Sequence, residues 1–266
     1  FQGYGRGNRM NRRKFNKMSV VTSGATMMGG GAFYMIFKDS DPLKPFYDAT
    51  RKVYQNRFGD NIAVTLFSET KQAYKNILPE IPYIGGKENI FSEWLNYGAY
   101  YLGVYQALSA HGYPIDEIGK IIFDTYETMA NYPKWFLHIV GNLKYGRKYE
   151  DKLRQAAAVS QERKYSGDFM SYFVEGTDED FDYGLDITEC GICKLYAAYG
   201  ANKLSRYMCL SDYVASKAFN RGLVRYKTIA EGADKCDFRF KKGRETFVYP
   251  LRDGWPPQFL DSSTDM

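Results

Sequence analysis

The spacing of apolar residues divides this chain into a helical first half and a mixed second half. Between residues 43 and 164 the apolar positions recur every three or four residues, which is the period of an amphipathic helix. Prolines and glycines interrupt the pattern, and Pro133 is expected to kink or break the fourth segment. The pattern predicts helices over residues 43–58, 61–78, 90–108, 115–145 and 148–164.

The third of these segments has the clearest apolar face. The residues of this face are spaced alternately by four and three positions. They are Ile90, Trp94, Tyr97, Tyr101, Val104 and Leu108. An aromatic stripe of this kind is typical of a protein core or a subunit contact. We therefore favour a packing role for this face over a cofactor-binding role.

After Gly167 the period changes from that of a helix to that of a strand. Alternation predicts strands over residues 169–174, 181–187, 223–230 and 236–240. Helices are predicted between them, over residues 188–199 and 206–219. Helices first and strands later are typical of an α+β fold. We expect a helical region at 39–164 packed on a small mixed or antiparallel sheet with helices at 165–245, and an irregular tail at 246–266.

The first 38 residues differ in character from the rest. Residues 1–17 carry six basic groups and no acidic one, and residues 18–37 carry no charge. The run NRRKFNK at residues 11–17 resembles a twin-arginine export leader. No small-x-small cleavage site follows, so we expect residues 1–38 to be retained as a leader and membrane anchor. Residues 18–37 would cross the bilayer, and the body would be exported to its periplasmic or outer side.

The charge of the remaining chain excludes one class of partner. The formal net charge is +5, but without the six basic groups of the leader 30 basic residues face 31 acidic ones. A nucleic-acid-binding protein carries its positive charge on a folded face. We therefore expect no nucleic acid, and instead a protein partner or a second copy of the chain, bound through helices rich in the 24 tyrosines.

Two common kinds of site are not expected. The chain has only two histidines, His111 and His138, too few to favour a Ser-His-Asp triad or a multi-histidine metal site. The acidic run at 178–189 has the spacing of a calcium-binding EF-hand loop, but Tyr183 stands where that loop needs glycine. Its alternation of apolar and polar residues favours a strand instead.

The four cysteines all lie in the second half, at Cys190, Cys193, Cys209 and Cys236. They admit three interpretations: thiolate ligands of a metal ion or iron–sulfur cluster, two disulfides in an oxidising exterior, or a catalytic thiol with bystanders. On a regular helix Cys190 and Cys193 could not easily bridge each other. We expect free thiols, with a metal site formed by all four as the second interpretation.

Two stretches carry a family resemblance. They are DITECGICKLYAAYGANKLSRYMCLSDYVASKAF at 186–219 and VRYKTIAEGADKCDFRF at 224–240. The first has a cysteine opening a helix, then C-x-x-D, and the second has T-x-A-x-G-x-x-x-C-x-F. Over about residues 165–242 the chain resembles the L-2-amino-thiazoline-4-carboxylic acid hydrolase family. The matching site positions are Cys190, Cys209, Asp212 and Cys236, whereas Cys193 is additional to the pattern.

The resemblance implies an enzyme that uses water to open a small ring at a carbon bonded to nitrogen and sulfur. That step needs a nucleophile or activated water, a carboxylate for proton transfer and a donor for the departing group. Cys209 and Asp212, three residues apart on one helix, could supply a thiol and a carboxylate on the same face. Two alternatives remain: small buried core residues without a chemical role, and a non-catalytic or cofactor-holding subunit of a membrane-associated redox complex.

Overall fold

The computed structural model describes residues 41–177 and 179–247. The expected leader, including the uncharged run 18–37, lies outside the described residues, as does the tail from residue 248. No helix in the described part of the chain combines the length and the apolar character that a membrane crossing requires. From Leu43 onward the described residues form one compact unit.

The helices of the first half confirm the predicted pattern. Gly59, at a φ of 78°, separates the first two, and Pro133 breaks the predicted segment 115–145 into two helices. The helices are α2 (Lys44–Phe58), α3 (Asp60–Ile77), α4 (Phe91–Ala110), α5 (Ile115–Met129), α6 (Lys134–Lys144) and α7 (Arg147–Ser160).

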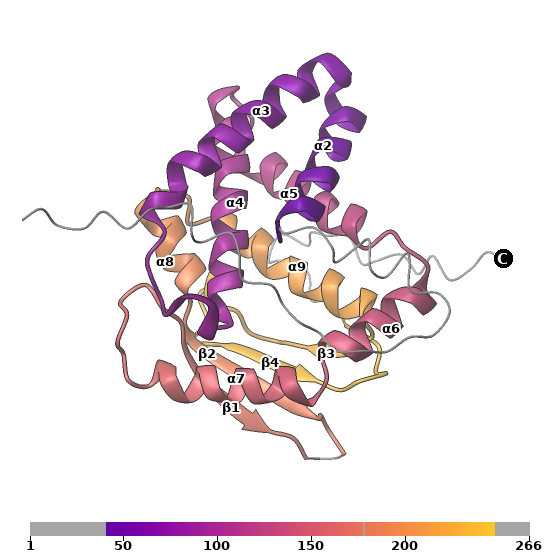
Figure 1. Cartoon of the computed structure of the whole chain (residues 1–266), viewed down its shortest axis with the longest axis vertical. Coiled ribbons are helices and arrows are strands. Elements are labelled where there is room, and N and C mark those ends of the chain that lie inside the picture. Colours follow the sequence, from indigo (N-terminus) through magenta and orange to yellow (C-terminus); the bar gives the residue numbers. More distant parts are fainter. Residues whose placement is uncertain (1–40, 178, 248–266) are drawn as a thin grey trace, which may run out of the picture. The chain divides into compact units, whose positions relative to one another are not determined.

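Helix α4 lies among its neighbours rather than at the surface. It packs against α3, α5 and α8 (Gly191–Ala198), as Figure 1 shows. Buried side chains occur on all of its faces. Gly103 allows the closest approach, because a Cβ there would lie 2.9 Å from the backbone nitrogen of Tyr74 on α3. The aromatic face belongs to this core, as predicted: Phe46 of α2 stacks on Tyr97 with ring centroids 4.6 Å apart.

Within the described residues, the strands form one four-stranded sheet in the order β1-β2-β4-β3, and each neighbouring pair is antiparallel. Their bounds are β1 (Met170–Glu175), β2 (Tyr183–Glu189), β3 (Leu223–Val224) and β4 (Cys236–Phe240). On the inner face Ile187 of β2 is opposite Cys236 of β4, and both are buried. On the other face Asp186 pairs with Lys235 and Arg239, which is an ordinary use for one carboxylate of the acidic run.

The predicted strand at 223–230 is wrong beyond its second residue. The backbone nitrogens of Tyr226 and Lys227 donate to the Asp237 side chain, at 3.0 and 2.6 Å, instead of to a neighbouring strand. The chain then forms a short 3-10 turn at Ile229–Glu231, where Thr228 accepts from the Glu231 nitrogen. Alternation alone could not reveal that a side chain would replace the strand partner.

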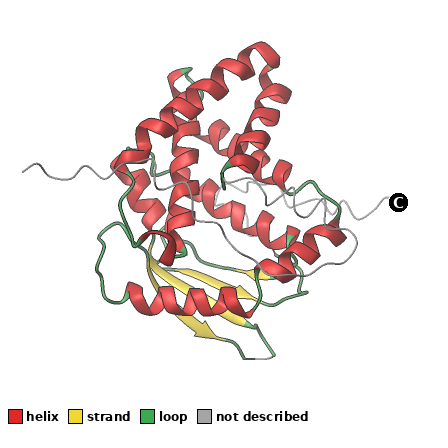
Figure 2. Cartoon of the chain, viewed as in Figure 1, coloured by secondary structure: helices red, strands yellow, loops and turns green. Residues whose placement is uncertain are grey.

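The remaining helices pack against α4 and α5, whereas α7 packs directly on β1. These remaining helices are α8 and α9 (Leu204–Ala218), and α9 contacts α5 on one side and β3 on the other. The predicted helix 188–199 begins later than expected, since β2 continues to Glu189 and the helix starts at Gly191. Figure 2 shows helices beside a small sheet, and the α+β prediction is confirmed.

Candidate active site

Helix α9 supplies the centre of the candidate site. Cys209 and Asp212 lie one turn apart on it, so their side chains leave the same face of the helix. Cys190 and Cys193 come from the start of α8, and Cys236 comes from the first position of β4. The five groups lie within electrostatic range of one another: Cys209 is influenced by Cys236, Asp212 and Cys193, and Cys190 by Cys209. The structure thus brings together all the residues proposed from the sequence.

A sixth residue, an arginine that the sequence analysis did not suggest, completes the centre. Arg225 is only 1% exposed, and its Nη1 lies 2.6 Å from Asp212 Oδ2. Its Nη2 donates to the backbone oxygen of Cys209 at 2.8 Å, so one guanidinium holds both residues of the C-x-x-D pair. The guanidinium also lies over the rings of Tyr213 and Phe238, at 4.6 and 4.8 Å from their centroids.

Asp212 keeps an accessible carboxylate despite this pairing. Its side chain is 42% exposed, and Oδ1 has no hydrogen-bond partner among the described residues. Loss of solvent around the group raises the pKa of Asp212, while the Arg225 charge and hydrogen bond, and the Arg221 charge, act in the opposite direction. The site therefore presents a carboxylate oxygen that can accept a proton.

The thiols differ in ease of ionisation. Burial raises the pKa of Cys209 well above its ordinary value, although Arg225 opposes the effect. Burial also raises the pKa of Cys236 to about 11, and the Ile229 nitrogen donates to its sulfur at 3.3 Å. In the pair at the start of α8, the mutual hydrogen bond raises the pKa of Cys190 and lowers that of Cys193 to about 7, with help from Ser205. Cys193 is thus the thiol that ionises first.

Tyrosines of α4, α5 and α8 extend the site. Burial, with a contribution from the Asp212 charge, raises the pKa of Tyr126 on α5 far above its ordinary value. Tyr101 on α4 is fully buried, and its hydroxyl has no hydrogen-bond partner within the described part of the chain. Tyr196 on α8 donates to the Gly98 oxygen at 2.9 Å. Tyr126 therefore places a neutral phenol near the carboxylate, and Tyr196 places one near the cysteines.

The metal interpretation of Cys190, Cys193, Cys209 and Cys236 finds no support in this geometry. Among the described residues, which include all four cysteines, no group of three or more ligating side chains is arranged to hold a metal ion. All four are free thiols in the structure.

The model of the L-2-amino-thiazoline-4-carboxylic acid hydrolase family matches residues 103–240. The chain belongs to this family. The match begins in α4, so it also covers the helical region from residue 103 and not only the stretch 165–242 that carried the resemblance in the sequence. Comparison with curated proteins and with solved structures gives no match.

The family's matched region contains every residue of the candidate site except Tyr101. Arg225 was not proposed from the sequence, because the strand predicted at 223–230 did not indicate that its side chain points into the site. One pattern could have revealed it: a single arginine lies among apolar and aromatic residues in LVRY, close after C-x-x-D. Since a buried cation needs an anionic partner, the carboxylate of that motif was the available candidate.

Proposed function

We propose that this protein is a hydrolase that opens a small ring at a carbon bonded to nitrogen and sulfur. Membership of the family supports this reaction class. The observation that carries the proposal is the accessible Asp212 carboxylate, which the buried Arg225 holds through one oxygen only.

In the first step Asp212 acts as the general base. A water molecule at Oδ1 gives a proton to the carboxylate while its oxygen attacks the ring carbon between nitrogen and sulfur, and the electron pair of the carbon–nitrogen double bond moves to the ring nitrogen. The ring nitrogen takes the remaining proton of the added hydroxyl group when the carbonyl forms. Loss of solvent raises the pKa of Asp212, which makes it a stronger base than an ordinary aspartate, and the charge and hydrogen bond of Arg225 oppose that rise. The two influences together suit proton transfer at physiological pH.

In the second step the bond between carbon and sulfur breaks. The departing sulfur takes the proton that Asp212 accepted, so the carboxylate is regenerated and one water molecule is consumed. Cys209 and Cys190 are neutral thiols, because their pKa values are raised, and can donate hydrogen bonds to the charge that develops on the departing group. Cys236 is only 4% exposed and accepts from the Ile229 nitrogen, so we assign it to positioning the loop before β4.

The test is hydrolysis of L-2-amino-thiazoline-4-carboxylate by the purified full chain. Ring opening at sulfur releases one thiol per turnover, which an aromatic disulfide reagent detects after the protein has been removed. We expect Asp212→Asn to lower kcat by a factor of about 100 or more, the range of general-base catalysis. Asp234→Asn is the matched control, since Asp234 is 73% exposed and its Lys227 contact is a loose 3.5 Å.

Two results would contradict the proposal. One is full activity of a folded Asp212→Asn variant, which would remove the base from the mechanism. The other is the absence of turnover by the folded wild-type chain with any small thiazoline, which would favour a non-catalytic or cofactor-holding subunit of a membrane-associated complex.

A further inference from the structure

Cys190 and Cys193 are not on one regular helix, contrary to the premise of the sequence analysis. Cys190 has extended backbone angles, φ −109° and ψ 118°, and α8 begins only at Gly191. In a regular helix, residues three apart keep their Cβ atoms about 5–6 Å apart, which is too far for a disulfide. With Cys190 outside the helix that restriction no longer applies, and its side chain can approach the first turn of α8.

The two residues between these cysteines are fixed by packing. A Cβ on Gly191 would lie 2.8 Å from the Gly167 oxygen, so this position is closed against the preceding loop. Ile192 packs against α4 at Gly98, where a Cβ would meet its Cγ1 at 3.0 Å. The turn is therefore held on both sides, and the positions of the two sulfurs are set by the fold rather than by chance rotation of an exposed loop.

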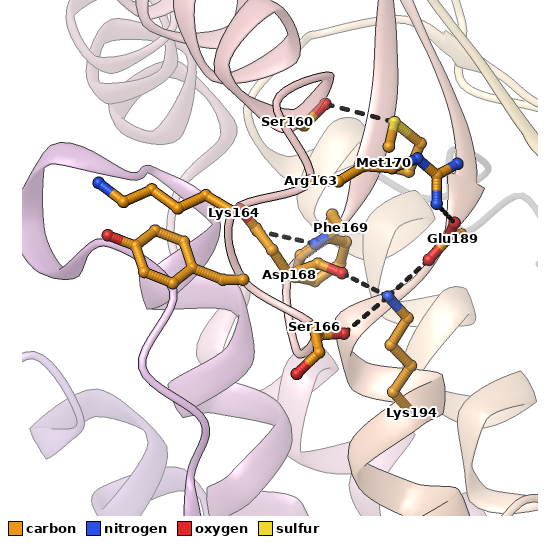
Figure 3. A pocket seen from close by; sticks show the side chains of 10 residues that line it. Ser160, Arg163, Lys164, Ser166, Asp168, Phe169, Met170, Glu189 and Lys194 are labelled. Atoms are coloured by element: carbon orange, nitrogen blue, oxygen red, sulfur yellow. Dashed lines mark hydrogen bonds and ion pairs between the residues drawn. The ribbon is translucent and has the colours of Figure 1, made fainter.

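Lys194, directly after Cys193, provides a third set of contacts that holds the turn. Its Nζ lies 2.7 Å from Glu189, directly before Cys190, and donates to the backbone oxygens of Ser166 and Asp168 at 3.0 and 2.9 Å. Figure 3 shows this lysine reaching from α8 into a hollow of about 350 Å³, with Arg163 on the far side of Glu189. The ion pairs of Glu189 with Lys194 and Arg163 therefore stabilise the strand-to-helix turn that carries the cysteines.

The surroundings of the two sulfurs suit thiol–disulfide exchange. Each side chain shifts the pKa of the other, which places the two thiols side by side, and both residues are half-buried. Ser205 of α9 also hydrogen-bonds Cys193 and helps to lower its pKa to about 7. The thiolate is the nucleophile in disulfide exchange, and a pKa near the ambient pH is close to optimal for it.

We propose that Cys190 and Cys193 are a redox-active dithiol whose substrates are disulfides, either small or on a protein. The Cys193 thiolate attacks one sulfur of the substrate disulfide, forms a mixed disulfide and releases the first thiol. Cys190 then loses its proton and attacks the Cys193 sulfur, which releases the second thiol. Two protein thiols and one disulfide become one protein disulfide and two thiols, so atoms and electrons balance. This activity does not rest on the proposed hydrolysis.

The experiment equilibrates the reduced full chain with a series of reduced and oxidised glutathione mixtures, without any hydrolase substrate. Acid quenching, alkylation of the remaining thiols and peptide mass spectrometry then locate each bond. We expect two thiols to be lost together at one midpoint, with a bond between Cys190 and Cys193, while Cys209 and Cys236 are alkylated throughout. A far-ultraviolet circular dichroism spectrum at each ratio shows that the chain stays folded.

Two serine variants test the order of attack. Cys190→Ser should trap one glutathione on Cys193, because the second attack is missing, and Cys193→Ser should take up none at the same ratios. Cys236→Ser is the matched control and should form the same disulfide as the wild type. A folded wild type that stays reduced at every ratio, a bond to Cys209 or Cys236, or equal glutathione uptake by both serine variants would overturn the proposal.

Discussion

Arg225 Nη1 lies 2.6 Å from Asp212 Oδ2, and the two partners of this ion pair differ sharply in exposure. The guanidinium is almost completely buried, whereas the carboxylate side chain is 42% exposed. Water can therefore replace Arg225 as a partner of Asp212, but it cannot replace Asp212 as a partner of Arg225. This asymmetry leads to a measurable difference between two variants.

Asp212→Asn should destabilise the fold more than Arg225→Met does. The first change leaves a buried cation without its anion, which we expect to cost about 2 kcal/mol, below the 3–5 kcal/mol of a fully buried pair because Asp212 reaches solvent. The second leaves a carboxylate that water can solvate, at a cost of about 1 kcal/mol. Urea unfolding measures both. If the double variant lost as much stability as the two single variants summed, the residues would not be coupled.

The pH dependence of hydrolysis should report the raised pKa of Asp212. The base form is required, so kcat/KM should rise with pH along an acid limb that lies above the usual range of an aspartate. Arg225→Met should move this limb to higher pH, because the arginine lowers the pKa of Asp212. Initial rates at subsaturating substrate measure kcat/KM at each pH. If the acid limb lay at the same pH in Arg225→Met as in the wild type, a group other than Asp212 would cause the pH dependence.

The effect of Arg225 on this pKa fixes the direction of one stability effect. The Arg225 charge lowers the pKa of Asp212, so the stability that the ion pair contributes is present when the carboxylate is ionised and is lost as pH falls through the folded pKa. The stability difference between Arg225→Met and the wild type should therefore shrink as pH falls through this window. Urea midpoints of the two proteins across that window check the sign.

Alkylation should distinguish the four cysteines by rate. Cys193 should react first with iodoacetamide, with a rate that rises with pH through about 7, because its thiolate is stabilised by Cys190 and Ser205. Burial raises the pKa of Cys209 and of Cys236, so both should react slowly until the chain unfolds. Peptide mapping at short times measures the rates, and faster labelling of Cys236 than of Cys193 would contradict the assignment.

Gly191→Ala should loosen the turn before α8. The new Cβ would lie 2.8 Å from the Gly167 oxygen and from a ring carbon of Phe169, and overpacking of this kind costs about 1–3 kcal/mol. Gly146→Ala is the matched control, since its nearest neighbour is the Asn142 oxygen at an ordinary 3.5 Å, and the change should cost under about 1 kcal/mol. Thermal unfolding compares the two, and equal losses would show that Gly191 is not closed by packing.

The first 38 residues make a prediction about location. We expect the full chain in the membrane fraction, with its body accessible to protease added from outside the cytoplasm. If residues 1–38 are the twin-arginine leader that they resemble, replacing Arg12 and Arg13 with lysines should leave the protein on the cytoplasmic side. Recovery of the unaltered full-length chain from the soluble cytoplasmic fraction would contradict the anchor.

Periodicity predicted much of the fold because burial on one face imposes it. Helices α2 and α3 match their predictions within one residue at each end, and the bounds of β4 agree fully. Helix α4 is different, since it is buried on all sides and its visible stripe shows only part of the buried surface. The strand predicted after Val224 was wrong for a different reason. The backbone nitrogens there donate to the Asp237 side chain, and no periodic pattern reveals that contact.

The candidate site was predictable in its residue types but not in its electrostatics. The sequence motifs predicted Cys190, Cys209 and Asp212 as site residues, and the fold brings them together. The pairing of Arg225 with Asp212 depends on where the chain turns after β3, which follows from long-range packing. The lowered pKa of Cys193 likewise depends on Cys190 leaving the helix and on Ser205 of α9, neither of which spacing alone reveals.

The pairing of β2 with β4 also determines when the site can form during folding. Residues 183–187 pair with residues 236–240, and the chain between them contains α8, α9 and Arg225. Closing so long a loop is slow compared with forming the local contacts of a helical hairpin such as α2 and α3. Cys236 reaches the other thiols only after this closure. An intermediate with its early helices in place would therefore be inactive, and recovery of activity should follow the slow, sheet-forming phase of refolding.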